Sequence, residues 1–239
     1  MDKQSFARYT GKVGEYTLQV VKTASWYNRW LFSNFKGYLD GEILEVGAGI
    51  GNLTKLLLEK GEVTAIDYKI SYLNKLKKIK VLGRRPKVGW GDIEKGRYFF
   101  SNKSFDCVVC TNVLEHIEDD LAALKNIFKL LKRGGRLILL VPFSQFAYGE
   151  IDKGLGHYRR YSKGEIEDKI KKAGFKLESI KYLNFLGIIG WFLNSKVFKR
   201  DTLPKNQLKL FNLLSRPFLY IERFVEAPIG LSILAICEK

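Results

Sequence analysis

Short apolar runs and amphipathic runs alternate along the chain from residue 42 onward, and this alternation constrains the fold more than any other feature. The apolar runs resemble buried strands and lie at 42–46, 62–67, 105–113 and 136–142, with further ones at 87–92, 176–183 and 231–239. The runs with helical spacing lie at 52–61, 70–80, 119–135 and 162–175. Strands that alternate with helices form a mainly parallel sheet covered on both faces. We therefore expect an α/β fold with a Rossmann-like, doubly wound sheet.

Two segments stand outside this alternation. Residues 1–41 precede the first strand and are rich in aromatic side chains, so we expect an N-terminal helical cap over the ligand-binding edge of the sheet. Residues 184–230 separate the last two expected strands, and a bare loop of that length is improbable in a compact domain. We expect a helical insertion or lid there, within a main domain that spans residues 42–239.

The cysteines and the apolar runs bear on the cellular setting. Cys107 and Cys110 lie inside an expected strand, where cysteine acts as a small apolar residue, and Cys237 is the third of three. We therefore expect no disulfide framework, no metal site, and a reducing, cytoplasmic setting. Residues 1–16 lack the apolar core of a signal peptide, and the most apolar run, 183–194, is too short to span a bilayer.

The formal net charge of +16 leaves two kinds of partner open. A basic surface attracts polyanions such as RNA and anionic lipid headgroups, although Lys and Arg are spread along this chain. Residues 184–228 mix aromatic and basic side chains, which suits either a packed lid or peripheral contact with the inner face of a membrane. The sequence gives no indication of the oligomeric state.

A glycine-rich turn, Gly47-Ala48-Gly49-Ile50-Gly51, joins the first strand to the first helix. Glycine lets a backbone turn approach a ligand closely, and such turns lie at the carboxyl edge of a doubly wound sheet. Asn52 stands where the dinucleotide fingerprint requires its third glycine, and no Lys followed by Ser or Thr completes a phosphate-binding loop. The turn therefore indicates a nucleotide-like ligand and disfavours a nicotinamide oxidoreductase.

Acidic residues end the next two expected strands. Asp67 follows Gly47 by 20 residues, and a carboxylate there can accept hydrogen bonds from the hydroxyls of a ribose. Asp92 ends the third strand, where its carboxylate could accept from an adenine amino group while the Ile93 N–H donates to the ring. Together with the glycine turn, these two acids predict a nucleoside-containing ligand.

These residues resemble the class I S-adenosylmethionine-dependent methyltransferases. The resemblance rests on five stretches in order and spacing: ILEVGAGIGNLT (43–54), VTAIDYK (63–69), WGDIE (90–94), FDCVVCTNVLEHIED (105–119) and LKRGGRLILLVPF (131–143). The chain is most similar to small-molecule methyltransferases with an L-E-H segment after the fourth strand. The resemblance implies a seven-stranded sheet whose last strand is antiparallel and inserted beside the fifth.

The resemblance also implies the cofactor, S-adenosyl-L-methionine, and the product S-adenosyl-L-homocysteine. The implied cofactor-binding residues are Glu45, Gly47, Ala48, Gly49, Gly51, Asp67, Tyr68, Asp92, Ile93 and Asn112. Glu45 and the glycine turn would hold the methionine part, and Asp67 would bind the ribose with Tyr68 beside the adenine. Asp92 and Ile93 would read the adenine edge, and Asn112 would offer its backbone carbonyl to the cofactor amino group.

Methyl transfer from a sulfonium needs alignment and exclusion of water, and a base helps when the acceptor is a hydroxyl. His157 lies in a mixed polar loop after the fifth strand and is the candidate catalytic base. The candidate substrate-binding residues are His116, Tyr158, Arg159, Arg160 and Tyr161. For His116 the alternative is a purely structural hydrogen bond, and for the loop it is a solvated basic turn.

The absence of certain sequence motifs narrows the range of possible methyl acceptors. No Asn/Asp-Pro-Pro-Tyr/Phe follows the fourth strand, which argues against methylation of DNA amino groups, and the cysteines lie in strands, which argues against a cysteine nucleophile. We expect a methyltransferase acting on a small-molecule, glycan or lipid-linked acceptor at oxygen. The alternatives are an RNA methyltransferase and a non-catalytic S-adenosylmethionine-binding protein.

Overall fold

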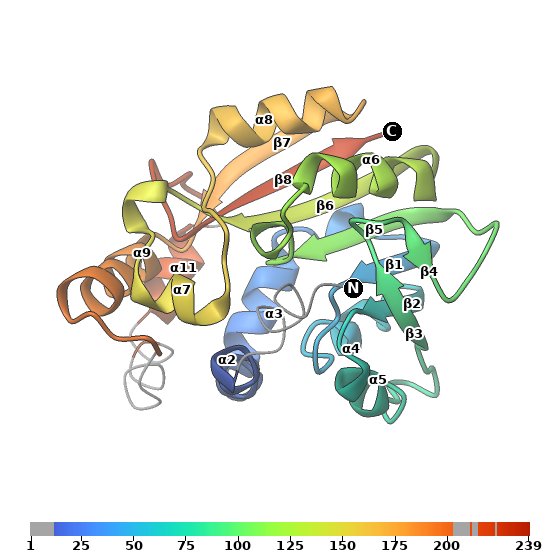
Figure 1. The fold of residues 1–239 in the computed structure, drawn as a ribbon, viewed down its shortest axis with the longest axis horizontal. Coiled ribbons are helices and arrows are strands. Elements are labelled where there is room, and N and C mark those ends of the chain that lie inside the picture. Colours follow the sequence, from blue (N-terminus) through green and yellow to red (C-terminus); the bar gives the residue numbers. More distant parts are fainter. Residues whose placement is uncertain (1–11, 203–210, 212–214, 223) are drawn as a thin grey trace.

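A computed structural model describes residues 12–202, 211, 215–222 and 224–239. Its centre is one sheet with the strand order β4-β3-β2-β1-β5-β6-β8-β7 (Figure 1). The strands are β1 Glu42–Val46, β2 Glu62–Asp67, β3 Lys87–Asp92, β4 Arg97–Tyr98, β5 Phe105–Thr111, β6 Leu131–Pro142, β7 Lys176–Leu183 and β8 Ser232–Glu238. The expected α/β, doubly wound fold is confirmed. The expected direction and place of the last strand are confirmed as well, since β8 runs antiparallel to both β6 and β7 and lies between them.

The sheet has eight strands rather than the seven expected. The additional strand is β4, which pairs antiparallel with the end of β3 through Gly91↔Tyr98 and Asp92↔Arg97. A turn with Gly96 at φ 64° reverses the chain between them. A two-residue strand at a sheet edge is too short to show a periodic pattern, so sequence periodicity could not predict it.

Alternate residues of the buried strands pack into two cores, one on each face of the sheet. On one face, Ile43, Val63 and Val109 pack with α3 Ser25–Ser33, α4 Thr54–Leu57 and α5 Ile70–Leu76. On the other face, Leu44, Ile66 and Val108 pack with α6 Asp120–Leu130 and α8 Lys163–Lys172. Figure 1 shows these helices as two layers with the sheet between them.

Helix α6 ends earlier than its periodic pattern predicts. The pattern runs to 135, but the helix stops at Leu130, and Leu131 already pairs with Phe105 of β5. Gly134, at φ 74°, then lies inside the first part of β6 rather than at a helix end. Pairing with a neighbouring strand therefore overrides the helical spacing of the last residues.

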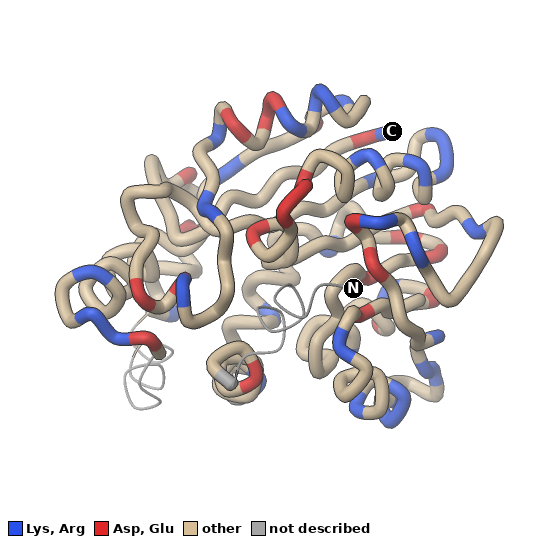
Figure 2. Tube along the Cα trace, in the orientation of Figure 1, with Lys and Arg blue, Asp and Glu red and all other residues tan. Residues whose placement is uncertain are grey.

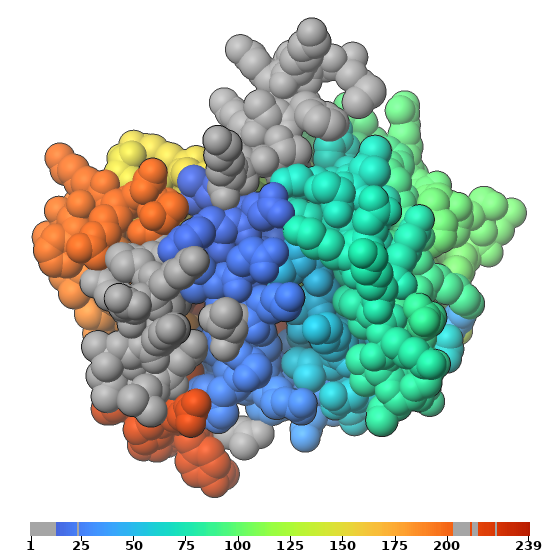
Figure 3. Space-filling model, turned by 90° about the horizontal axis from the view of Figure 1, so that it is seen from below, coloured from blue at the N-terminus to red at the C-terminus, as the bar shows by residue number. Residues whose placement is uncertain are grey.

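The remaining helices gather at the carboxyl ends of the parallel strands (Figure 1). They are α2 Lys12–Thr23, α7 Glu150–Leu155, α9 Phe185–Phe192, the π-helical turn η4 Leu193–Val197 and α11 Arg216–Ile221. Three short 3₁₀ turns also occur: η1 Lys36–Tyr38 before β1, η2 Leu114–His116 after β5 and η3 Gln145–Ala147 after β6. Figure 3 shows α2 between the segment around residues 190–200 and the segment around 60–80. Residues 1–11 of the expected cap, and 203–210, 212–214 and 223 of the expected insertion, lie outside the described residues. Of the helices described, none has both the length and the apolar character needed to cross a bilayer.

Candidate active site

A cavity of about 1140 Å³ opens where β1, β2, β3 and β5 end, and helices α2 and α9 form much of its other wall. Nine of the ten expected cofactor-binding residues line it: Glu45, Gly47, Ala48, Gly49, Asp67, Tyr68, Asp92, Ile93 and Asn112. Gly51, the tenth, is not among the lining residues. The carboxyl ends of neighbouring strands thus bring these residues together, as ligand sites in doubly wound sheets require.

The glycine turn is held against β2 and packed closely against protein side chains. The N–H groups of Gly47 and Ala48 donate to the Ile66 carbonyl at 2.9 and 3.1 Å. A Cβ on Gly47 would lie 2.5 Å from Val113 Cγ2, and one on Gly51 would lie 2.1 Å from Ile79 Cδ1. Both residues also have positive φ angles, so the protein's own packing requires glycine at these two positions.

Asp67 connects the turn to the end of β2. One carboxylate oxygen accepts from the Gly49 N–H and the other from the Lys69 N–H, both at 2.7 Å. Burial raises the pKa of this carboxyl, while the two backbone hydrogen bonds oppose the shift. Each carboxylate oxygen can accept a further hydrogen bond, so the group retains capacity for two hydroxyls of a ligand.

Glu45 is a second acid of the cavity and is 3% exposed. Its carboxylate accepts a hydrogen bond from the Thr54 hydroxyl. Burial raises its pKa to about 8, and the nearby charge of Asp67 adds to the shift. A cation in the cavity would stabilise the ionised form, and the amino group and sulfonium of S-adenosylmethionine are cations of the kind that fits here.

The adenine end of the expected site contains Asp92 and an aromatic pair. Asp92 accepts from the Lys95 N–H at 3.0 Å, and the rings of Tyr68 and Trp90 lie 5.9 Å apart at the cavity wall. Asn112, just after β5, has φ 52°, a left-handed conformation that asparagine tolerates better than most residues. Its N–H donates to Leu140, so the backbone turns sharply at the cavity edge.

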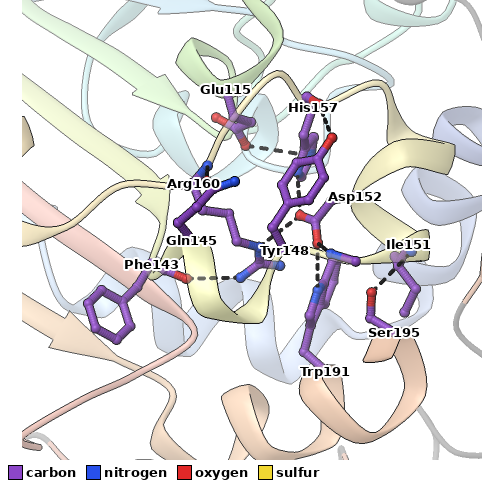
Figure 4. Close-up of polar contacts among 11 residues, drawn as sticks. Glu115, Phe143, Gln145, Tyr148, Ile151, Asp152, His157, Arg160, Trp191 and Ser195 are labelled. Atoms are coloured by element: carbon purple, nitrogen blue, oxygen red, sulfur yellow. Dashed lines mark hydrogen bonds and ion pairs between the residues drawn. The ribbon is translucent and has the colours of Figure 1, made fainter. Parts of the chain in front are cut away.

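A second polar cluster, built around Asp152 (Figure 4), borders the same cavity through His157, Arg160 and Trp191. One oxygen of this fully buried carboxylate lies 2.8 Å from His157 Nδ1 and accepts from Arg160 Nε at 2.8 Å. The other accepts from Trp191 Nε1 at 3.1 Å. Burial alone would raise the pKa of Asp152, but His157 and Arg160 hold it below its usual value.

Glu115 and His116 complete this cluster from η2. Glu115 is 1% exposed, and neither of its carboxylate oxygens accepts a hydrogen bond from another described residue. His157 Nε2 lies 4.0 Å from Glu115 Oε1, and burial raises the pKa of Glu115 to about 7. The His116 ring packs edge-on against His157 at 4.7 Å, and burial lowers the pKa of His116 to about 3, so that imidazole is neutral near pH 7.

The expected substrate-binding residues divide into two groups. His116, Tyr158 and Arg160 line the cavity together with the expected base, His157. Arg159 and Tyr161 do not line it, and both bind Asp120, at 2.8 and 2.9 Å. Their side chains anchor the loop to α6. The sequence does not reveal which polar side chains of this loop face the cavity and which face α6.

Sequence reasoning placed Asp152 in the polar loop of His157 but missed its hydrogen bond to that imidazole, and it missed the roles of Glu115 and Trp191 in this cluster. Glu115 stood inside the L-E-H segment, and an acid so near the end of a strand at the ligand edge was the available signal. Trp191 comes from α9, 39 residues after Asp152 in the chain, and no pattern in the sequence links the two.

Comparisons with known proteins agree with this geometry. A family model described as a methyltransferase domain matches residues 44–137. The ubiquinone/menaquinone biosynthesis C-methyltransferase UbiE of Cronobacter sakazakii is 30% identical over 125 residues, 49% of this chain and 48% of the relative. A ubiquinone biosynthesis O-methyltransferase of Xanthomonas axonopodis pv. citri is 30% identical over 158 residues, 58% of this chain and 64% of the relative. The chain thus spans less than two thirds of the length of either relative.

Solved structures share the fold. A S-adenosylmethionine-dependent methyltransferase of Thermotoga maritima superposes with a TM-score of 0.61 at 18% identity, over 95% of this chain and 98% of its own. One from Archaeoglobus fulgidus gives 0.57 at 14% identity, over 92% and 94%. Residues 44–137 thus match a methyltransferase domain, and the fold of the whole chain is shared with solved S-adenosylmethionine-dependent methyltransferases.

Proposed function

We propose that the chain transfers the methyl group of S-adenosyl-L-methionine to an oxygen of a small acceptor that binds at the His157 end of the cavity. The observation that carries this proposal is one cavity whose lining holds two groups of residues: Glu45, Asp67 and Asp92, here called the cofactor end, and His116 and His157, here called the acceptor end. A cavity of about 1140 Å³ exceeds the usual range for a single ligand, so it has room for a cofactor and an acceptor together.

In this proposal the cofactor supplies an activated methyl group, and the protein's residues position it. Glu45 and the glycine turn would hold the methionine part, Asp67 the ribose, and Asp92 with Ile93 the adenine. His157 would remove the acceptor proton. With Nδ1–H directed at Asp152, 2.8 Å away, its Nε2 is left as the proton-accepting atom on the cavity side.

The acceptor half of the cavity favours a largely apolar molecule. Its lining includes Leu186, Trp191, Leu193, Phe198 and Phe211, all from the segment between β7 and β8. The relatives from Cronobacter and Xanthomonas are named for ubiquinone biosynthesis, one as a C-methyltransferase and one as an O-methyltransferase. Within the expected classes, this lining supports a small or lipid-linked acceptor over a glycan. Lys and Arg lie on several separate elements rather than along one stripe (Figure 2), which gives RNA no particular support.

The outer surface of the same segment supports a lipid-linked acceptor. Large apolar side chains that do not line the cavity are exposed there, namely Phe185, Ile189, Val197, Phe218, Tyr220, Ile221, Phe224 and Val225. Lys196, Lys199 and Arg216 stand among them in the chain. Apolar side chains interspersed with basic ones bind anionic bilayer surfaces. Sedimentation with anionic vesicles, but not with zwitterionic ones, is the expected result, and equal recovery in both supernatants would count against membrane contact.

The proposed activity is tested in two steps. Titration calorimetry should detect binding of S-adenosylmethionine and S-adenosylhomocysteine but not of NAD. Labelled methyl groups should then enter the lipid or small-molecule fraction of a cell extract rather than its RNA, glycan or protein fractions. Binding of the cofactor with no incorporation into any fraction would favour the non-catalytic alternative, and no binding would overturn the proposal.

A further inference from the structure

Glu115, His116 and His157 bring one carboxylate and two imidazoles together at the cavity wall. The carboxylate oxygen and ring nitrogens that could bind an ion all lie within 4.8 Å of one another. We propose that these three residues bind one divalent transition-metal ion, such as Zn²⁺. This goes beyond the proposed function, because methyl transfer from a sulfonium has no general need for a metal.

The first argument is the state of Glu115. Its side chain is almost fully buried, and no described residue donates a hydrogen bond to either oxygen. A buried carboxylate without partners is costly unless it is protonated or paired with a cation. His157 Nε2, at 4.0 Å, is beyond hydrogen-bond distance. A cation between the two side chains would bind both at once.

The second argument is the support behind the two imidazoles. Metal-binding histidines almost always use their other ring nitrogen to donate to a carboxylate or a backbone carbonyl. Nδ1 of His157 lies 2.8 Å from the Asp152 carboxylate, and Arg160 and Trp191 hold that carboxylate in turn. His116 has a hydrogen bond to the backbone of Gly156. Each imidazole is thus oriented through one nitrogen, as a ligand would be.

The third argument is geometric. Ligand atoms around a tetrahedral zinc ion lie about 3.4 Å apart, since each is roughly 2.1 Å from the metal. A shift of about 1 Å in these side chains would therefore complete the site. Two imidazoles and one carboxylate suit Zn²⁺ and the other divalent first-row metals better than Mg²⁺ or Ca²⁺, which prefer oxygen ligands. Three protein ligands leave a position open, and here it would face the cavity.

A bound ion would change how His157 acts. Its Nε2 would be a metal ligand and could not accept a proton. The positive charge of the ion would instead promote loss of the acceptor proton by lowering the pKa of the acceptor hydroxyl. In the metal-free protein the same lone pair is available as the proposed base. The two roles of His157 are thus separable by removing the metal.

The test is metal binding by the full chain, measured without turnover. After treatment with a chelator, the protein should bind one Zn²⁺ per chain in calorimetry. Co²⁺ should give a visible absorption spectrum with imidazole coordination. Glu115→Gln, which keeps the side-chain shape, should weaken binding by at least 100-fold. Asp152→Asn, which alters the support of His157 but removes no ligand, should weaken it by about 10- to 100-fold.

Glu118→Gln is the matched control, because Glu118 is an exposed acid of the same segment, and it should bind Zn²⁺ like the wild type. Retained S-adenosylmethionine binding shows that each variant is folded. Equal metal affinity in the wild type and Glu115→Gln, or no binding in either, would overturn the proposal. These outcomes are independent of the proposed function, which fails only if cofactor binding or methyl transfer is absent.

Discussion

The two ends of the cavity are built in different ways. The cofactor end comes from the ends of successive strands, within residues 45–112, and backbone hydrogen bonds such as those to Asp67 hold it. The acceptor end joins η2, α7, the loop at 157–161 and α9, and buried side chains around Asp152 hold it. The order of the strands therefore positions the cofactor end, whereas hydrogen bonds between buried side chains position the acceptor end. Substitutions should therefore affect one end and spare the other.

The largest expected effect concerns His157. His157→Ala should slow turnover by about 10²- to 10⁴-fold, because it removes the group that acts on the acceptor proton. Cofactor affinity should stay within about 2-fold of wild type, since no cofactor-end residue contacts the Asp152 cluster in the bonds described. Steady-state kinetics and cofactor titration measure the two effects. Normal turnover in this variant would remove His157 from the chemistry.

The next effect is a pH dependence of stability at the cofactor end. Burial raises the folded-state pKa of Glu45 to about 8, from a model-peptide value of 4.5. The folded protein thus binds more protons than the unfolded chain between these values, and its stability falls as the pH rises through this window. For one such group the fall is on the order of 3 kcal/mol.

Glu45→Gln should reduce this fall without abolishing it, because burial also raises the pKa values of Glu115 and Asp67. Urea unfolding at pH 5 and pH 8 measures the difference. Saturating S-adenosylmethionine should restore stability at pH 8 in the wild type more than in the variant. A wild type equally stable at both pH values would contradict the assignment of Glu45 as a buried acid without a cation.

Asp67→Ala should affect only the cofactor end. It removes a carboxylate that accepts two backbone hydrogen bonds and is the expected ribose ligand. Loss of charged hydrogen bonds of this kind costs about 2–3 kcal/mol, or roughly 30- to 150-fold in cofactor affinity. Calorimetry measures the loss, and Zn²⁺ affinity at the other end should not change. A parallel loss of metal binding would show that the two ends are coupled.

The smallest effect separates packing from backbone strain in the glycine turn. Gly51 and Gly83 have similar positive φ angles, 84° and 79°, but only Gly51 has side chains within 4 Å of an added Cβ. Gly51→Ala should therefore destabilise the protein by about 1–2 kcal/mol more than Gly83→Ala. Thermal unfolding of the two variants compares them. Equal melting temperatures would mean that φ alone selects glycine at this turn.

The sequence was sufficient for the long strands and for most of the residues that their carboxyl ends bring to one cavity. Hydrophobic periodicity located the long strands, and parallel strands must end at one edge, so Asp67 and Asp92 had to lie close to the glycine turn. It was insufficient where pairing overrides local spacing, as at the early end of α6 and at β4. The sequence suggested that Gly51 is glycine to make room for a ligand. In the structure the side chain of Ile79 occupies the space beside it.

The acceptor end was only partly predictable. His157 was proposed as the base from its polar surroundings, but Trp191 and Glu115 join its cluster through contacts between residues far apart in the chain. Neighbours in the sequence were misleading as well. Arg159 and Arg160 are adjacent, yet one binds Asp120 of α6 and the other lies buried on Asp152. An irregular loop lacks the regular repeat of a helix or strand, so the direction of its side chains cannot be predicted from their spacing in the sequence.

The antiparallel direction of β8 has a consequence for how such chains can diversify. Leu183, the last residue of β7, pairs with Ser232, the first residue of β8, so the segment between them leaves and re-enters the sheet at one point. That segment can lengthen, shorten or be exchanged without shifting the register of any strand. A new acceptor specificity could arise by grafting this one stretch, while the methyl-donor apparatus is inherited unchanged.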